Sequence, residues 1–230
     1  EASATMLASV ATLATLTLVL PAFTTSAPGP QFSATQLTFA AIASLTLYLL
    51  FVFVQTVRHR DSFVGATAEP EPQDHPEPSA REALVSVGLL LVALVGVVGL
   101  AKVESPAIDD AVDSIGAPQS AVGVAVALLV LLPEGLSAVR SARRGRLQTS
   151  FNLAFGSAMA SIGLTIPAIA IASIWLDGRL VLGLDTGQIV LFAISVAVAS
   201  LTVIPGRATL QESGIHLVLF AAFIVLAINP

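Results

Sequence analysis

The stretch VALLVLLPEGLSAVRSARRGR, residues 126–146, combines an apolar run, a carboxylate and a cluster of arginines. Residues 122–132 carry no charge, and Pro133 then interrupts the pattern immediately before Glu134. Four of the seven residues from Arg140 to Arg146 are arginine. An apolar run that ends in arginines is typical of a membrane helix reaching an aqueous surface, so an acid inside that run requires an explanation.

The composition of the whole chain also indicates an integral membrane protein. Hydrophobic residues make up 55% of the 230 residues, charged residues make up 11%, and the mean hydropathy is +0.90. A solvated globular surface needs more charge than this. The chain has no cysteine, which excludes a disulfide framework and thiol chemistry. Nothing in the charge pattern indicates nucleic-acid binding.

Apolar helical spans account for most of the chain. Crossing the hydrocarbon layer takes about 20 mostly apolar residues in a helix. Seven segments satisfy this requirement, at 5–24, 36–57, 82–102, 118–139, 149–175, 187–204 and 210–229. The predicted fold class is therefore all-α, a polytopic membrane helix bundle of about seven transmembrane helices.

The distribution of lysine and arginine predicts the orientation of these spans, because cytoplasmic loops retain positive charge. Threading seven spans places eight basic residues on one side and two, Lys102 and Arg179, on the other. The amino terminus and the loops at 58–81, 140–148 and 205–209 are expected to be cytoplasmic, and the carboxyl terminus is expected outside.

Residues 58–81 form a proline-rich acidic segment that divides the chain. Prolines alternate there with Glu69, Glu71, Asp74 and Glu77, and apolar residues are scarce. Such a segment cannot build a core. We interpret it as a solvated cytoplasmic linker, in preference to a cation sensor, between a two-helix part (1–57) and a five-helix part (82–230).

The Pro133–Glu134 pair is the first candidate for a functional site. Proline lacks an amide donor, and we expect the helix to kink or unwind beside the carboxylate, with freed carbonyls facing the same cavity. Transporters build cation sites from such broken helices. An ionised side chain at the bilayer centre costs roughly 3 kcal/mol, so Glu134 needs a partner or a proton. The alternative is that it lies near the headgroups and extends towards Arg140 or Arg144.

The span at 149–175 offers oxygen ligands to such an acid. Helical spacing aligns four hydroxyls in one stripe, Ser150, Ser157, Ser161 and Thr165. Gly156, Ala160 and Gly163 lie on a neighbouring face, where small residues allow close helix packing. Asn152 is expected to bond another helix. Hydroxyl and carbonyl oxygens suit sodium or calcium, although serines in membrane helices also bond their own backbone and serve packing alone.

The segment LLPEGLSAVRSARRGRLQTSFNLAFGSAMASIGLTIP, residues 131–167, closely resembles the second alpha-repeat of the cation/proton exchangers in the calcium/cation antiporter superfamily. The resemblance is nearest to the bacterial ChaA-type sodium/calcium-proton antiporters. It extends to LVLPAF, FSATQ, LFVFVQTVRHRDSFV and GRATLQESGIHLVLFAAF, so that it covers nearly the whole chain as the second half of such an antiporter.

The resemblance implies a function, a location and a set of site residues. It implies a secondary antiporter of the bacterial inner membrane that exports Ca²⁺ or Na⁺, with K⁺ as a further candidate, against inward H⁺ flow. Glu134, preceded by Pro133, corresponds to the essential carboxylate. Gly156 and Ser157 correspond to the segment that completes the cation site, which makes Glu134 and Ser157 the expected metal ligands.

Two departures from the family pattern affect the ligand set. Distant exchangers have an asparagine-containing motif before the acid, where this chain has Leu132 and Pro133. They also have glutamine after the GSA segment, where this chain has Met159, which leaves Ser161 as a less defined ligand.

The family also has a first repeat, related to the second by inversion, that supplies another acid, and this chain contains no such repeat. We therefore expect an amino-terminally truncated fragment whose partner is the missing repeat. Two alternatives are a homo-oligomer of half-transporters and a membrane scaffold without transport.

Enzymatic functions find no support in the residues. A retinal protein needs a lysine in a late helix, and the sole lysine, Lys102, lies at a membrane edge. There is no HExxH or GxSxG motif. His59 and His75 lie in the linker, and His216 stands near Glu212, where we interpret it as a polar packing residue. We expect no enzyme activity and no cofactor beyond the transported ions.

Overall fold

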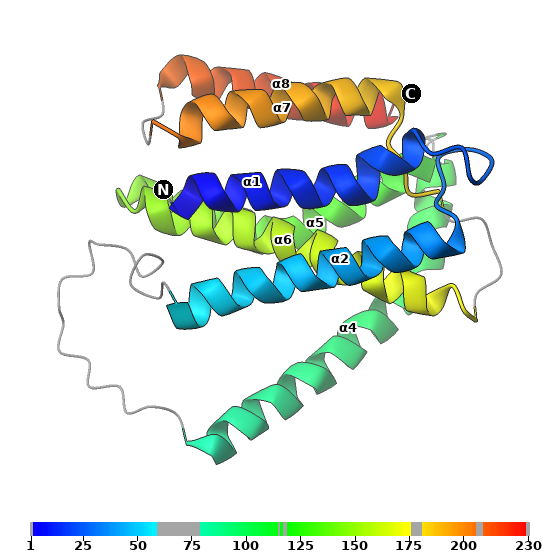
Figure 1. Ribbon diagram of the computed structural model, residues 1–230, viewed down its shortest axis with the longest axis horizontal. Helices are drawn as coiled ribbons and strands as arrows, with labels where there is room; N and C mark the ends of the chain where they lie inside the picture. Colours follow the sequence, from blue (N-terminus) through cyan, green and yellow to red (C-terminus); the bar gives the residue numbers. More distant parts are fainter. Residues whose placement is uncertain are drawn as a thin grey trace. The chain divides into compact units, whose positions relative to one another are not determined.

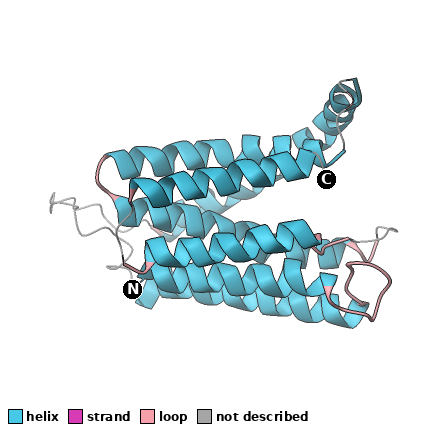
Figure 2. Cartoon of the chain, turned by 90° about the horizontal axis from the view of Figure 1, so that it is seen from above, coloured by secondary structure: helices cyan, strands magenta, loops and turns pink. Residues whose placement is uncertain are grey.

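The computed structural model describes residues 2–58, 79–114, 116, 119–175, 181–205 and 209–228. These residues form helices joined by loops, and no strand occurs among them (Figure 2). The all-α prediction is therefore confirmed. Residues 59–78, which make up most of the predicted acidic linker, lie outside the described residues.

Each predicted span corresponds to a helical segment. Helix α1 continues through a π-helical turn (η1) and a 3-10 turn (η2), and α2 continues through a second π-helical turn (η3). In chain order the elements are α1 (Ala2–Ala14), η1 (Thr15–Val19), η2 (Leu20–Ala22), α2 (Ala34–Phe53), η3 (Val54–Arg58), α4 (Ala80–Ser114), α5 (Gln119–Arg143), α6 (Leu147–Ala172), α7 (Thr186–Val203) and α8 (Leu210–Ile228).

Within the described residues, six helices are long and apolar enough to cross a membrane. The seventh predicted span, 82–102, lies inside α4, which continues to Ser114 instead of ending near 102. Large apolar side chains are exposed along the helices, for example Phe39 at 63% and Leu217 at 69%. Apolar surface on this scale is expected where lipid replaces water as the solvent.

Four helices begin with a reciprocal cap between side chain and backbone. In each, the N-cap side chain accepts a hydrogen bond from the amide three residues later, whose glutamine or glutamate accepts the N-cap amide. The pairs are Ser33–Gln36 in α2, Ser79–Glu82 in α4, Asp185–Gln188 in α7 and Thr209–Glu212 in α8. These local signals define where each chain segment turns into helix.

Contacts divide the chain into two compact units. The first comprises Glu1–Thr67 and Leu131–Leu226, and the second comprises Ala68–Val130 and Ala227–Pro230. In the first unit, α6 packs against both α1 and α2 (Figure 1). Met159 of α6 is fully buried in this packing, as are Leu13 of α1 and Ala40 of α2.

The contact between α2 and α6 depends on a glycine. A Cβ atom at Gly163 would lie 2.8 Å from Cβ of Tyr48 and 3.2 Å from its Cγ. At Gly156, two turns earlier, a Cβ would lie 3.9 Å from the Phe51 ring, an ordinary contact distance. The prediction that small residues on this face permit close packing is therefore confirmed, with α2 as the partner.

A loop segment ties α7 to the helix pair α1 and α2. The amides of Leu182 and Gly183 donate to the Pro30 carbonyl at 3.2 and 3.0 Å, and the Leu184 amide donates to the Leu18 carbonyl at 2.9 Å. A Cβ at Gly183 would lie 2.6 Å from that of Pro30. The backbone therefore approaches at a distance that only glycine allows.

We predict that Gly163→Ala lowers the thermal unfolding midpoint of the purified chain in detergent. The added methyl overlaps Tyr48, and overpacking of this kind costs about 1–3 kcal/mol. Gly156→Ala in the same helix is the matched control, since it gains the same helix propensity, roughly 1 kcal/mol, without overlap. Equal midpoints for the two variants would contradict the close approach of α2 and α6.

Candidate functional site

The predicted site residues Glu134 and Ser157 are in contact. Ser157 Oγ of α6 donates a hydrogen bond to Glu134 Oε2 of α5 at 2.6 Å. Both side chains are half-buried, and both belong to the same compact unit. A short hydrogen bond to a carboxylate is among the stronger ones in proteins. The acid inside the apolar helix therefore has a polar partner on the next helix.

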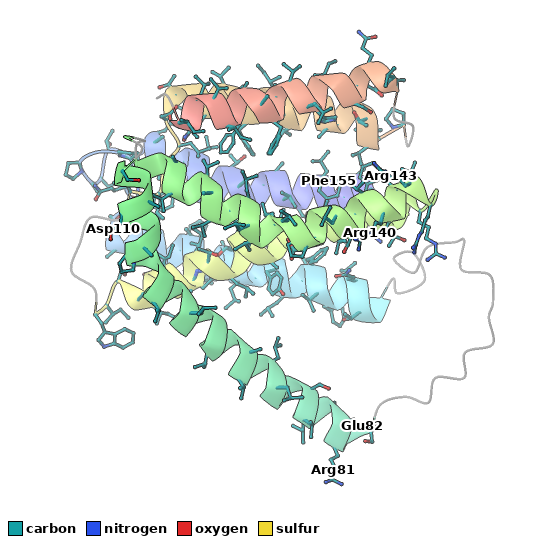
Figure 3. All side chains as sticks on the ribbon, turned by 180° about the vertical axis from the view of Figure 1, so that it is seen from behind. Arg81, Glu82, Asp110, Arg140, Arg143 and Phe155 are labelled. Carbon is teal, nitrogen blue, oxygen red and sulfur yellow. The ribbon has the colours of Figure 1, made fainter. Side chains whose placement is uncertain are left out.

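The position of Glu134 along α5 places it well inside the helix. It lies nine residues before the last residue, Arg143, which corresponds to about 14 Å along the axis. Its carboxylate accepts a hydrogen bond from Ser157, whereas the alternative of a position near the headgroups concerns membrane depth and stays open. Arg140 and Arg143 lie near the end of the helix (Figure 3).

Helix α5 runs without interruption through Pro133. We expected the helix to kink or unwind beside the carboxylate. Unwinding is wrong, since residues on both sides of the proline are α-helical, and a kink stays a prediction. A single proline removes one backbone hydrogen bond, here the one to the Leu129 carbonyl, and the flanking bonds are sufficient to carry the helix past it. Pro133 thus leaves one carbonyl without its usual helical donor one turn before Glu134.

The other predicted site residues occupy different surroundings. Gly156 faces Phe51 of α2, so it serves helix packing next to the site residue Ser157. Ser161 is exposed one turn further along α6. In the rest of the hydroxyl stripe, Ser150 is half-buried and Thr165 is exposed. The structure therefore brings Ser157 to the acid, while the role of Gly156 and Ser161 in cation binding stays a prediction.

A half-buried chain of polar side chains connects α6 to α1. Ser3 Oγ donates to Gln148 Oε1 at 3.0 Å, and Gln148 Nε2 donates to Asn152 Oδ1 at 3.1 Å. Asn152, expected to bond another helix, is thus linked to α1 through Gln148. Sequence reasoning missed Gln148 and Ser3, and it also missed Tyr48 and Phe51 of α2, because nothing in their local pattern indicates which helix they contact.

His216 has a partner on the neighbouring helix. Its Nε2 lies 3.2 Å from Thr202 Oγ1, which also bonds the Val198 carbonyl at 3.1 Å. This contact joins α8 to α7, as expected for a polar packing residue.

The donor set at Glu134 is small. A sodium or calcium ion bound by protein oxygens takes several ligands, six to eight for calcium. Among the described residues no group of three or more acidic, histidine or cysteine side chains could hold a metal. Glu134 and Ser157 can therefore contribute a carboxylate and a hydroxyl to a cation site, but they do not complete one by themselves.

A comparison with protein families decides which family this is. The family model described as "sodium/calcium exchanger protein" matches residues 85–229, more than half of the chain. The chain belongs to the sodium/calcium exchanger family. The match includes α5 and α6, and with them both Glu134 and Ser157. Together with the apolar helices, membership of this exchanger family establishes a multi-pass membrane protein and confirms the resemblance noted in the sequence.

Two curated relatives of this exchanger chain are similar over nearly all of it. The Sinorhizobium fredii protein y4hA, whose name describes ionic transport, is 43% identical over 231 residues, 100% of this chain. The Escherichia coli sodium-potassium/proton antiporter ChaA is 30% identical over 213 residues, 91% of this chain. The chain spans 62% and 58% of the lengths of these relatives. Their names describe transporters and no enzyme. No solved structure matches the chain.

We predict that Glu134 and Ser157 are energetically coupled. In a double-mutant cycle with Glu134→Gln and Ser157→Ala, the free energies of unfolding in detergent should show a coupling of about 1.5–3 kcal/mol, the range for hydrogen bonds to charged groups. The cycle of Glu134→Gln with Ser161→Ala is the control and should show none. A coupling near zero for both pairs would remove the basis for a joint site.

Proposed function

We propose that this chain supplies half of the ion pathway of a secondary active cation antiporter, in which a metal cation and a proton compete for Glu134. The proposed exchange moves Ca²⁺ or Na⁺, with K⁺ as a further candidate, out of the cytoplasm while H⁺ moves in. The observation that carries the proposal is the hydrogen bond of Ser157 to the Glu134 carboxylate between two apolar helices.

The names of the family and the relatives support Na⁺, K⁺ or Ca²⁺ as the transported cation. The family is described as a sodium/calcium exchanger, and the Escherichia coli relative is named a sodium-potassium/proton antiporter. These names agree with hard oxygen ligands, since carboxylates and hydroxyls favour Na⁺, K⁺ and Ca²⁺ over softer metals.

The proposed coupling follows from the chemistry of a single carboxylate. A proton covalently bound to the Glu134 carboxyl removes the negative charge that attracts a cation, and a bound cation stabilises the ionised form. Ser157 Oγ donates its hydrogen to Oε2 and keeps lone pairs for a metal. An empty, ionised site is costly to move through an apolar layer. Only the protonated or cation-loaded forms would then change access, which produces exchange.

The remaining ligands come from outside this pair. The inverted-repeat design of secondary transporters places cation sites at the interface of two repeats. We propose that a first repeat supplies a second acid opposite Glu134. The expected orientation, with the arginine-rich end of α5 in the cytoplasm and the molecule in the inner membrane, belongs to the same proposal.

We predict that Glu134→Gln abolishes cation-driven proton movement in everted membrane vesicles from cells that express the natural gene. Glutamine keeps the shape of the side chain but cannot exchange a proton for a cation. Acridine-orange fluorescence after addition of Ca²⁺, Na⁺ or K⁺ measures the exchange. Glu212→Gln is the control and should retain activity, because glutamine preserves the cap at Thr209. Full exchange by the Glu134 variant would refute the proposal, and wild-type vesicles without exchange for any cation would favour a scaffold.

We also predict that Ser157→Ala raises the half-saturating cation concentration about tenfold, since loss of one neutral oxygen ligand costs roughly 1–1.5 kcal/mol. Ser173→Ala, in the turn that follows α6, is the matched control, because its hydroxyl bonds the Ala170 carbonyl at 2.8 Å. The same vesicle assay over a range of cation concentrations distinguishes them. A Ser157 variant with wild-type saturation would show that the hydroxyl does not contact the ion.

A further inference from the structure

The turn between α5 and α6 carries a dense cluster of positive charge. Arg140, Arg143, Arg144 and Arg146 lie within seven residues, and all four are exposed. No aspartate or glutamate occurs from residue 135 to residue 176. The chain as a whole has a formal net charge of −5, so this cluster opposes the overall charge of the molecule.

The backbone holds this arginine cluster in a fixed arrangement. Helix α5 ends in a Schellman motif, in which the Gly145 amide donates to Ala142 at 2.9 Å and the Arg146 amide donates to Ser141 at 2.9 Å. Gly145 has φ +75, the left-handed conformation that this motif needs. Arg143 and Arg144 follow Arg140 by three and four residues, so the three side chains lie on one helical face.

The arginine cluster has no acidic partner in the part of the chain that the structure describes. No ion pair within the described ranges involves any of the four guanidinium groups. The nearest acid along the helix, Glu134, is about 9 Å from Arg140 along the axis and is engaged by Ser157. Four positive charges without an ion-pair partner among the described residues create a potential that attracts anions.

The arginine cluster is flanked by exposed apolar side chains. Leu136, Val139 and Leu147 flank the arginines and are exposed at 48%, 49% and 43%. Apolar surface next to cationic groups is expected at the boundary between hydrocarbon and headgroups, where arginine stems lie along the apolar layer and their charges reach the interface. The N-cap of α6, Arg146, makes no side-chain cap, which leaves first-turn amides of α6 as additional donors.

We propose that the α5–α6 turn is a binding surface for the phosphodiester headgroup of an anionic phospholipid, held by Arg140, Arg143, Arg144 and Arg146. Guanidinium groups bind phosphate oxygens in pairs of hydrogen bonds. Basic clusters that directly follow a membrane helix attract anionic lipids, each charge adding to the affinity. The flanking leucine and valine side chains favour a lipid, whose acyl chains they can contact, over a soluble phosphate. This inference is independent of the transported ion.

Native mass spectrometry of the purified chain in detergent tests the lipid surface directly. The chain is titrated with short-chain phosphatidylglycerol and, separately, with phosphatidylcholine of the same chain length. We expect phosphatidylglycerol adducts at concentrations at least tenfold lower. The variant R140Q/R143Q/R144Q/R146Q should bind both lipids alike, because each arginine contributes roughly fivefold. R81Q, which removes an arginine from the start of α4, should keep the wild-type preference.

A second variant keeps the test valid if the glutamine variant does not fold. R140K/R143K/R144K/R146K retains the charge and should still prefer phosphatidylglycerol, and circular dichroism verifies the helix content of every variant. Equal binding of the two lipids by the wild type, or an intact preference in a folded glutamine variant, would overturn the proposal. A lysine variant that folds but loses the preference would also overturn it.

Two further outcomes distinguish other occupants. If inorganic phosphate displaces phosphatidylglycerol at equal concentration, the surface binds soluble phosphate and the lipid assignment is wrong. If phosphatidylglycerol binds only after E69Q/E71Q/D74N/E77Q, the acidic linker of the same chain is the occupant, which also overturns it. An undiminished lipid preference in that variant and in the presence of millimolar phosphate supports the lipid surface.

Discussion

A carboxylate inside an apolar helix must be satisfied locally, and in this protein the hydroxyl of Ser157 satisfies Glu134. Water, which would otherwise solvate the charge, is absent from the hydrocarbon layer, so the acid depends on the position of α6 next to α5 for a hydrogen-bond partner. The 2.6 Å hydrogen bond between the two side chains is thus the contact around which the candidate site is organised. This hydrogen bond persists only if α6 keeps its position next to α5.

Close packing against α2 and α1 holds α6 in place. Gly163 admits Tyr48 at a distance that leaves no room for a methyl group, and Met159 is fully buried. The chain of hydrogen bonds from Ser3 through Gln148 adds a polar anchor to α1. Without a hydrophobic force between helices in lipid, such small-residue contacts and buried polar bonds are the available means of fixing a helix. Two residues of α6 that are two positions apart therefore have different roles. Ser157 contacts the acid, and Met159 packs in the core.

The helices and the central pair of the candidate site could be predicted from the sequence, because lipid burial leaves a long apolar run and helical spacing places hydroxyls on one face. The end of α4 could not, since hydropathy indicates where the hydrocarbon ends, while the helix continues to Ser114 through backbone hydrogen bonds. The helix does not unwind at Pro133, contrary to expectation, because one missing backbone donor does not break a helix whose neighbouring hydrogen bonds are intact. The contact of Tyr48 with Gly163 depends on which helices meet, and a local pattern contains no such information.

The brevity of the connection between α5 and α6 has a geometric consequence for Glu134 and Ser157. Counted from Gly145 at the bend, the acid lies eleven positions back and the serine twelve positions forward, which places both about 17 Å from the bend. Because the two helices of this hairpin extend equally far from the bend, Glu134 and Ser157 come to the same level and can meet. One extra residue within α6, between its start and Ser157, would turn Ser157 by about 100° about the helix axis, and the serine would no longer point at the acid. The spacing between the bend and the two side chains therefore determines the Glu134–Ser157 contact as much as the side chains themselves do.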